Sequence, residues 1–190
     1  MNFNKFIAIF LLGGIYKISE WSDMVTVHAL PGPDMVKQFF VHPDVKKNCG
    51  CVLVLEMSTA GALTTADYTK SIFHCQHNFL RHLYTMYIFF ILLDASQLGI
   101  DSPEVVLGFV GQSPPTSDWS GWIQFTPGVS VVSNNDSKGQ QYCSPTQAVL
   151  QKGADVIIVG RSIINHPDAL VAAEQCRAEG WDALMKRIEI

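Results

Sequence analysis

Five short runs of mostly apolar residues recur along this chain, and they constrain its fold more than any other feature. The runs are nearly continuous rather than alternating, which is typical of parallel strands covered on both faces. Segments with helical signals separate several of them, so the sequence predicts α/β architecture. The arrangement is either part of a barrel or an open sheet. The predicted strands are Met24–Ala29, Val52–Glu56, Val105–Val110, Trp122–Thr126 and Asp155–Val159.

The helical signals are clearest in the last third of the chain. Ser144 is predicted to cap a helix, because Pro145 follows at the first helical position and Gln147 stands at the capping-box position. Gly153 then stands where the residue after the helix end would. Thr64–Asp67 offers a similar start. The terminal segment carries apolar residues at helical spacing, which are Ala169, Ala173, Cys176, Leu184 and Ile188.

Length and composition narrow the function classes. A chain of 190 residues suggests one domain, yet it is short for a complete (β/α)8 barrel of typically ~250 residues. The net charge is -4 and no Lys/Arg run occurs, which argues against nucleic-acid binding. The apolar runs Phe6–Leu12 and Tyr84–Leu93 are shorter than the ~20 residues of a membrane span, so a small membrane protein is the least favoured alternative. Five scattered cysteines, an odd number without CxxC pairs, indicate reduced thiols and a cytoplasmic protein.

Residues 71–104 differ in composition from the rest of the chain. About forty residues separate Thr65 from Val105, which is long for a connection in an α/β fold. The stretch is rich in aromatic residues and histidine and shows no clear amphipathic stripe, so it is interpreted as an insertion. His74 and His77 could bind a metal, but no carboxylate or cysteine cluster supports them, and no metal site is predicted.

The end of the last predicted strand carries the most informative chemistry. Gly160 permits close approach of a ligand to the backbone, and Arg161 supplies a planar charged fork for phosphate oxygens. Gln140 and Tyr142 follow the preceding strand and can donate hydrogen bonds. Barrels commonly hold phosphate in the loops after their last two strands. We therefore predict that Arg161, Gln140 and Tyr142 converge on one phosphate. The alternatives are a surface arginine after a glycine turn and ordinary loop polarity.

Motifs in a fixed order surround these residues. They are Gly13–Ile18, Trp21–Val25, His28–Gly32, Leu55–Gly61, Asp67–Thr69, Thr126–Val129, Gly139–Pro145 and Ile158–Ile164. In this order they resemble the orotidine-5′-monophosphate decarboxylase family, particularly the decarboxylase domain of eukaryotic UMP synthase. The resemblance covers roughly residues 13–70 and 105–190. It implies a partial (β/α)8 TIM barrel with strands four to eight, as one incomplete domain over residues 1–190 with an insertion at 71–104.

The resemblance also implies a function and a set of binding residues. The family converts orotidine 5′-monophosphate (OMP) to UMP and CO2 in pyrimidine biosynthesis without a cofactor, and its members are homodimers. Binding energy from the remote phosphate helps to close the site around the reacting ring. In the family, the residues matching Met57 and Ser58 line and contact the pyrimidine. Pro127 matches the start of a closing loop. The phosphate clamp matches Gln140, Tyr142 and Arg161, with the amide of Gly160 nearby.

The beginning of the chain departs from the family pattern. The family carries an Asp-x-Lys-x-x-Asp motif just before the Gly-Gly helix, and a further lysine on the preceding strand. Residues 1–12 contain Lys5 but no aspartate, so no catalytic residue is assigned. The first three barrel strands are also missing. The alternatives are an inactive nucleotide-binding remnant, a truncated gene product, or another phosphate-binding barrel enzyme. The ordered motifs argue against the last.

Overall fold

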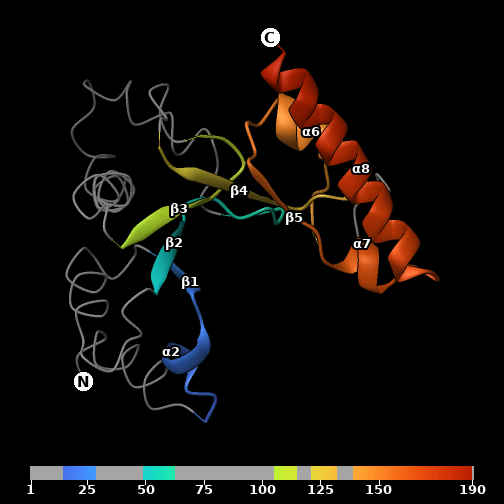
Figure 1. Cartoon of the computed structure of the whole chain (residues 1–190). Helices are drawn as coiled ribbons and strands as arrows, with labels where there is room; N and C mark the ends of the chain where they lie inside the picture. Colours follow the sequence, from blue (N-terminus) through green and yellow to red (C-terminus); the bar gives the residue numbers. More distant parts are fainter. Residues whose placement is uncertain (1–14, 29–48, 63–104, 115–120, 132–138, 190) are drawn as a thin grey trace, which may run out of the picture. The chain divides into compact units, whose positions relative to one another are not determined.

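The structure is a computed structural model that describes residues 15–28, 49–62, 105–114, 121–131 and 139–189. These residues belong to two compact units. The first unit includes the described residues up to Leu55 together with 105–108, and the second includes 56–62 and those from Phe109 onward. The strands form a five-stranded sheet in the order β1-β2-β3-β4-β5 (Figure 1). The strands are β1 (Met24–His28), β2 (Gly50–Val54), β3 (Val106–Val110), β4 (Ile123–Pro127) and β5 (Val156–Ile158).

The parallel α/β prediction is confirmed, with strand ends within two residues of those expected. β1 pairs with β2 in parallel from Met24 opposite Gly50 onward. β4 pairs with β5 in parallel from Phe125 opposite Val156. The predicted insertion at 71–104 and the helix start at Thr64 lie outside the described residues, as do Lys5, His74 and His77. No helix among the described residues is long and apolar enough to cross a bilayer.

In the first unit, β2 is buried along almost its whole length, as a continuous apolar run predicts. The short helix α2 (Ile18–Trp21) precedes β1. Cys51 is fully buried on β2, and burial, assisted by Cys49, raises the pKa of its thiol to about 12. Cys51 therefore stays protonated at neutral pH and packs as a small apolar side chain. Of the other described cysteines, Cys49 and Cys176 are buried and Cys143 is half-buried.

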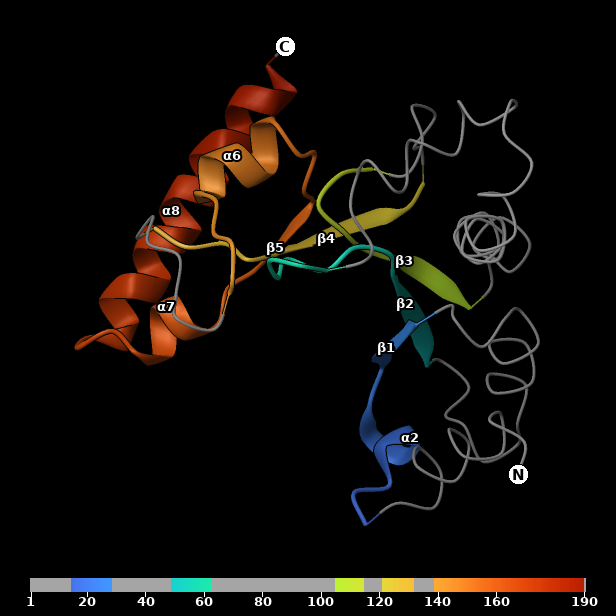
Figure 2. The same ribbon diagram turned by 180° about the vertical axis from the view of Figure 1, so that it is seen from behind.

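The second unit contains three helices, α6 (Pro145–Leu150), α7 (Arg161–Ile164) and α8 (Ala169–Ile188). Both α6 and α7 contact the long helix α8, which Figure 2 shows from behind. The capping box that the sequence predicts for α6 is present: Ser144 accepts from the Gln147 amide, and the Gln147 side chain accepts from the Ser144 amide. The helix ends sooner than Gly153 suggested, at Leu150, and Gly153 forms the following turn with φ +71°.

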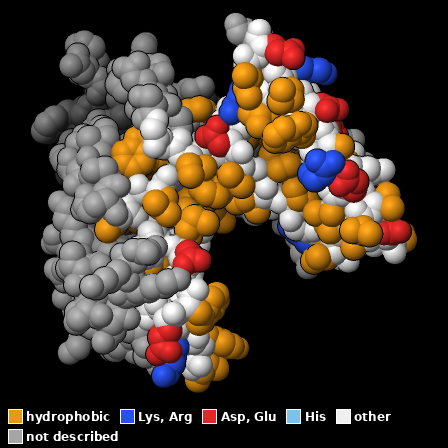
Figure 3. All heavy atoms as spheres, in the orientation of Figure 1, with side chains coloured by type: hydrophobic (Ala, Val, Ile, Leu, Met, Phe, Trp, Pro, Cys, Tyr) orange, Lys and Arg blue, Asp and Glu red, His pale blue; other side chains and the backbone are white. Residues whose placement is uncertain are grey.

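The buried face of α8 differs from the predicted stripe. Its buried residues are Ala172, Cys176 and Ala183, whereas Ile188 is 68% exposed. Small residues face inward because the strand beneath lies close: a Cβ on Gly180 would come within 3.3 Å of Ile157 Cδ1. Several large apolar side chains of α8 consequently lie on the outside, over the helix in Figure 3. They are Leu170, Val171, Met185 and Ile188.

Arg187 ties the end of α8 to the start of β5. Its guanidinium donates to the Ala154 carbonyl at 2.9 Å and to Asp155 Oδ1 at 2.8 Å. Asp155 in turn accepts from the Gln124 amide of β4 at 2.9 Å. One side chain thus anchors the terminal helix to the two strands whose ends carry the predicted phosphate residues.

Gln124 on β4 is fully buried, and within the part of the chain that the structure describes neither atom of its side-chain amide has a hydrogen-bond partner. Burying such a group costs free energy that an apolar side chain of similar size would not. We therefore expect Gln124→Met to raise the free energy of unfolding by about 1–2 kcal/mol, measured by urea denaturation. Gln175→Met on the exposed surface of α8 is the control and should change stability by less than about 0.5 kcal/mol. A clear loss of stability in Gln124→Met would contradict the prediction.

Candidate functional site

Three of the predicted binding residues meet in the second unit. Gln140 donates through Nε2 to Ser58 Oγ at 2.6 Å and to the Ser58 carbonyl at 3.1 Å. On its other side, Gln140 Oε1 accepts from Arg161 Nη2 at 3.4 Å. The carboxamide therefore stands between a hydroxyl and a guanidinium that lie far apart in the sequence. We call Ser58, Gln140 and Arg161 the Gln140 cluster.

Backbone hydrogen bonds join the two loops that carry Ser58 and Gln140. The Ala60 amide donates to the Gly139 carbonyl at 2.7 Å, and the Gln141 amide donates to the Ser58 carbonyl at 3.0 Å. Thr59 and Gln140 form an antiparallel bridge between these bonds. The loops that carry Ser58 and Gln140 are thus joined by a short antiparallel ladder, which the sequence did not indicate.

Gly128 brings a third segment against the same two loops. Its φ is +76°, a conformation that L side chains rarely adopt. A Cβ at this position would lie 2.6 Å from the Gln141 carbonyl oxygen, 2.7 Å from Gln140 Nε2 and 2.9 Å from Ser58 Cβ. Only glycine lets the chain after Pro127 pass this close to the Gln140 cluster.

The segment carrying Tyr142 is held by bonds on both sides. The Cys143 amide donates to the Gly128 carbonyl at 2.9 Å, and the Ser130 amide donates to the Cys143 carbonyl at 2.9 Å. Gln141, just before Tyr142, is bonded to Ser58. Tyr142 itself is half-buried. Its backbone is therefore fixed next to Gln140.

The remaining predicted residues stand at strand ends. Gly160 is exposed and directly precedes α7, of which Arg161 is the first residue. A Cβ at Gly160 would meet no atom within 4 Å, so close packing does not require glycine there. Met57 is 45% exposed and follows the buried Glu56. Pro127 is the last residue of β4. Its carbonyl accepts from Gln112 Nε2 at 3.1 Å.

The cluster offers the groups that recognise an anion. Arg161 is half-buried and carries a permanent charge, and the Ser58 hydroxyl group, which accepts from Gln140, can still donate its own hydrogen. No group of metal-ligating side chains occurs in the part of the chain that the structure describes. The arrangement suits an oxyanion that accepts from a guanidinium and a hydroxyl group, with the Gln140 carboxamide bonded to both.

Sequence reasoning missed Glu56 and Gln112. Glu56 is 4% exposed, and its Oε2 accepts from the Gln112 amide at 2.9 Å. No spacing pattern signals this contact, because the two residues are far apart in the chain. The sequence placed Glu56 at the end of a strand and gave Gln112 no role.

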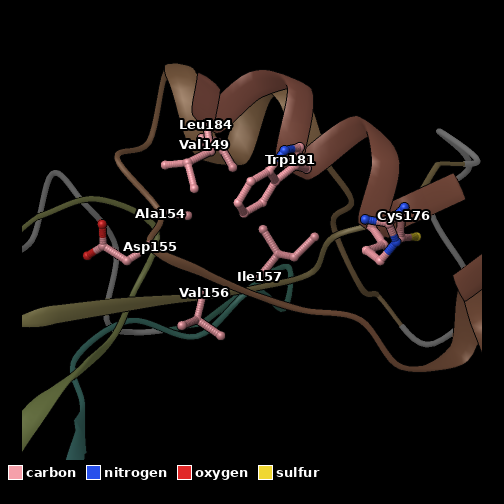
Figure 4. A pocket seen from close by; sticks show the side chains of 10 residues that line it. Val149, Ala154, Asp155, Val156, Ile157, Cys176, Trp181 and Leu184 are labelled. Carbon is pink, nitrogen blue, oxygen red and sulfur yellow. The ribbon is translucent and has the colours of Figure 1, made fainter. Parts of the chain in front are cut away.

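A separate cleft of about 330 Å³ lies between β5 and the helices α6 and α8 (Figure 4). Ile157 extends toward Trp181 across it, while Val156 lies on the opposite side of the strand. None of the predicted binding residues lines this cleft. The cleft is largely apolar and lies apart from the Gln140 cluster.

Comparison with known proteins gives consistent relatives. The sequence profile of the "Orotidine 5'-phosphate decarboxylase / HUMPS family" matches residues 10–176. Uridine 5′-monophosphate synthase of Bos taurus is 34% identical over 178 residues, covering 94% of this chain and 32% of that protein. Orotidine 5′-phosphate decarboxylase of Rhizopus oryzae is 33% identical over 179 residues, covering 93% of this chain and 58% of that protein. This chain thus spans less than two thirds of the length of either relative.

Solved structures agree on the fold. The crystal structure of orotidine 5′-monophosphate decarboxylase from Sulfolobus solfataricus matches with a TM-score of 0.57 at 19% identity, covering 93% of this chain and 70% of that one. The enzyme from Plasmodium berghei matches with a TM-score of 0.55 at 17% identity, covering all of this chain and 55% of that one. These likenesses concern the arrangement of strands and helices.

Proposed function

Because the chain belongs to the orotidine 5′-phosphate decarboxylase / HUMPS family, we propose that it binds a pyrimidine nucleotide through its 5′-phosphate and serves the conversion of OMP to UMP and CO2. The observation that carries the proposal is the Gln140 cluster, in which Arg161 and Ser58 meet on one carboxamide. In this proposal the phosphate lies at Arg161, Gln140 and Tyr142, and the pyrimidine ring lies at Met57 and Ser58, as in the family that the sequence resembles.

In this proposal the cluster contacts the nucleotide at two places, the phosphate and the base. Arg161 presents a charged fork that suits phosphate oxygens. Ser58 offers a hydroxyl and backbone groups to the edge of a base. Gln140 links the two, since the same carboxamide touches both residues. A nucleotide that engages the phosphate residues would therefore be oriented at the ring as well, which is how remote binding energy assists a reaction elsewhere on a substrate.

Titration with UMP tests the binding part of the proposal. Isothermal calorimetry on the purified chain should show binding of UMP and much weaker binding of uridine, because uridine lacks the phosphate. Equal affinity for the two ligands, or no UMP binding, would overturn the proposal. The catalytic part is tested in the same samples by monitoring the decarboxylation of OMP through the loss of its ultraviolet absorbance.

A second candidate is nucleotide binding without turnover. The Asp-x-Lys-x-x-Asp motif that family members carry before the Gly-Gly helix does not occur in residues 1–12. An ammonium beside the reacting carbon would stabilise the carbanion left by CO2, so a clamp without it should bind but react poorly. UMP binding with no loss of OMP supports this candidate, and measurable turnover overturns it.

We also propose that the protein is cytoplasmic, as its cysteine pattern indicates, and that it forms a homodimer, as the family resemblance implies. Sedimentation equilibrium of the purified chain tests the second point. A monomer at all concentrations up to the micromolar range would contradict it.

A further inference from the structure

We infer that Gln112 is a positioning residue for the segment that follows Pro127 and contacts the Gln140 cluster. It acts through the carbonyl of Pro127, and this role rests on the proposed function. Gln112 follows β3 and touches three separate segments of the second unit. Its amide N–H donates to Glu56 Oε2 at 2.9 Å. Its side-chain Nε2 donates to the Pro127 carbonyl at 3.1 Å, and its Oε1 accepts from Lys152 Nζ at 2.6 Å.

The contact with Pro127 takes the place of a rung of the sheet. The Gly111 amide donates to the Phe125 carbonyl of β4 at 3.0 Å. Carbonyls two residues apart on a strand point the same way, so the next acceptor facing β3 is that of Pro127. β3 ends at Val110, and the side chain of Gln112 reaches this carbonyl instead. The last acceptor of β4 is thus satisfied by a side chain at the point where the chain leaves the sheet.

Lys152 determines which end of the Gln112 carboxamide faces Pro127. An ammonium can only donate, so Oε1 must turn toward Lys152 and Nε2 toward the Pro127 carbonyl. The backbone at Gln112 is fixed as well, by Gly111 on one side and Glu56 on the other. Both contacts of the side chain are partly buried, which limits competition from water.

The position of Pro127 decides where Gly128 lies. Gly128 is in contact with Gln140 and Ser58, and a methyl group would not fit between them. Moving the Pro127 carbonyl would therefore shift Gly128 against the carboxamide that joins Ser58 to Arg161. Gln112 does not itself belong to the Gln140 cluster. Because the carboxamide that Gly128 contacts is the one bonded to Arg161, we expect a larger effect on Kd for UMP than on Kd for uridine.

The test compares Gln112→Met and Gln112→Glu with the native chain. Methionine keeps the size of the side chain, and glutamate keeps the acceptor for Lys152, but neither can donate to the Pro127 carbonyl at neutral pH. We expect Kd for UMP to rise by about three- to tenfold, the range for one lost hydrogen bond, and Kd for uridine to change by less than twofold. The amide resonance of Gly128 should shift in both variants without ligand. Gln175→Met, on the exposed surface of α8, should change none of these.

The outcomes separate the two proposals. A native chain that does not bind UMP would overturn the proposed function, and the Gly128 resonance would then decide the role of Gln112 alone. Unchanged UMP affinity in both variants, or an unmoved Gly128 resonance, would overturn the positioning role. Equal losses for UMP and uridine would also overturn it, since they would indicate general loosening of the fold.

Discussion

Replacing Arg161 with alanine is expected to raise Kd for UMP by about thirty- to a hundredfold. A charged hydrogen bond contributes about 2–3 kcal/mol, and each 1.4 kcal/mol is roughly a tenfold change in affinity. Arg161 is half-buried and donates to Gln140 Oε1, so its guanidinium is held beside the carboxamide before any ligand arrives. Arg161→Lys should lose less, because the ammonium keeps the charge but lacks the planar fork. Calorimetric titration with UMP measures both.

Arg177→Ala is the matched control for this prediction. Arg177 is exposed on α8 and pairs with Glu174 at 2.6 Å, so it has the same chemistry without contact to the Gln140 cluster. Its loss should change Kd for UMP by less than about twofold, since exposed ion pairs are worth little. Two results would contradict the assignment of Arg161 to the phosphate. One is an equal loss of UMP affinity in Arg161→Ala and Arg177→Ala, and the other is full UMP affinity in Arg161→Ala.

The fold was predictable from the sequence to the extent that burial produces a pattern. β2 is buried on both faces, and its continuous apolar run predicted a parallel strand. The cap of α6 was predictable because Ser144 and Gln147 act over three residues. The inward face of α8 was not predictable in the same way. Which residues face inward depends on how close β5 lies, and Gly180 against Ile157 shows that this distance is short.

In the candidate site, too, local features were predictable from the sequence and contacts between distant segments were not. The residues Gln140 and Arg161 were found because their types suit phosphate and they follow predicted strands. The ladder between Thr59 and Gln140 was missed, because it joins segments far apart in the chain. Gln112 was missed for a related reason: its side chain replaces a rung of the sheet, and nothing in the local sequence marks the point where a strand stops pairing through its backbone.

Gly128→Ala is expected to have the second large effect, lowering the free energy of unfolding by about 2–5 kcal/mol. Alanine at a φ of +76° is strained, and this left-handed conformation costs about 1–2 kcal/mol for a residue with a side chain. The new methyl group would also overlap the Gln141 carbonyl and the Gln140 carboxamide, and overpacking adds about 1–3 kcal/mol. Because the side chain of Gln140 must move away, binding of UMP should fall below detection even at temperatures where the variant remains folded.

Gly61→Ala separates the two causes. Gly61 has a φ of +79°, close to that of Gly128, but a Cβ there would meet no atom within 4 Å. It should therefore show only the cost of the backbone conformation, about 1–2 kcal/mol, and keep UMP affinity within about twofold. Urea denaturation and UMP titration of the two variants give the comparison. If Gly128→Ala were no less stable than Gly61→Ala and bound UMP normally, the chain after Pro127 could not lie against Gln140 as the structure has it.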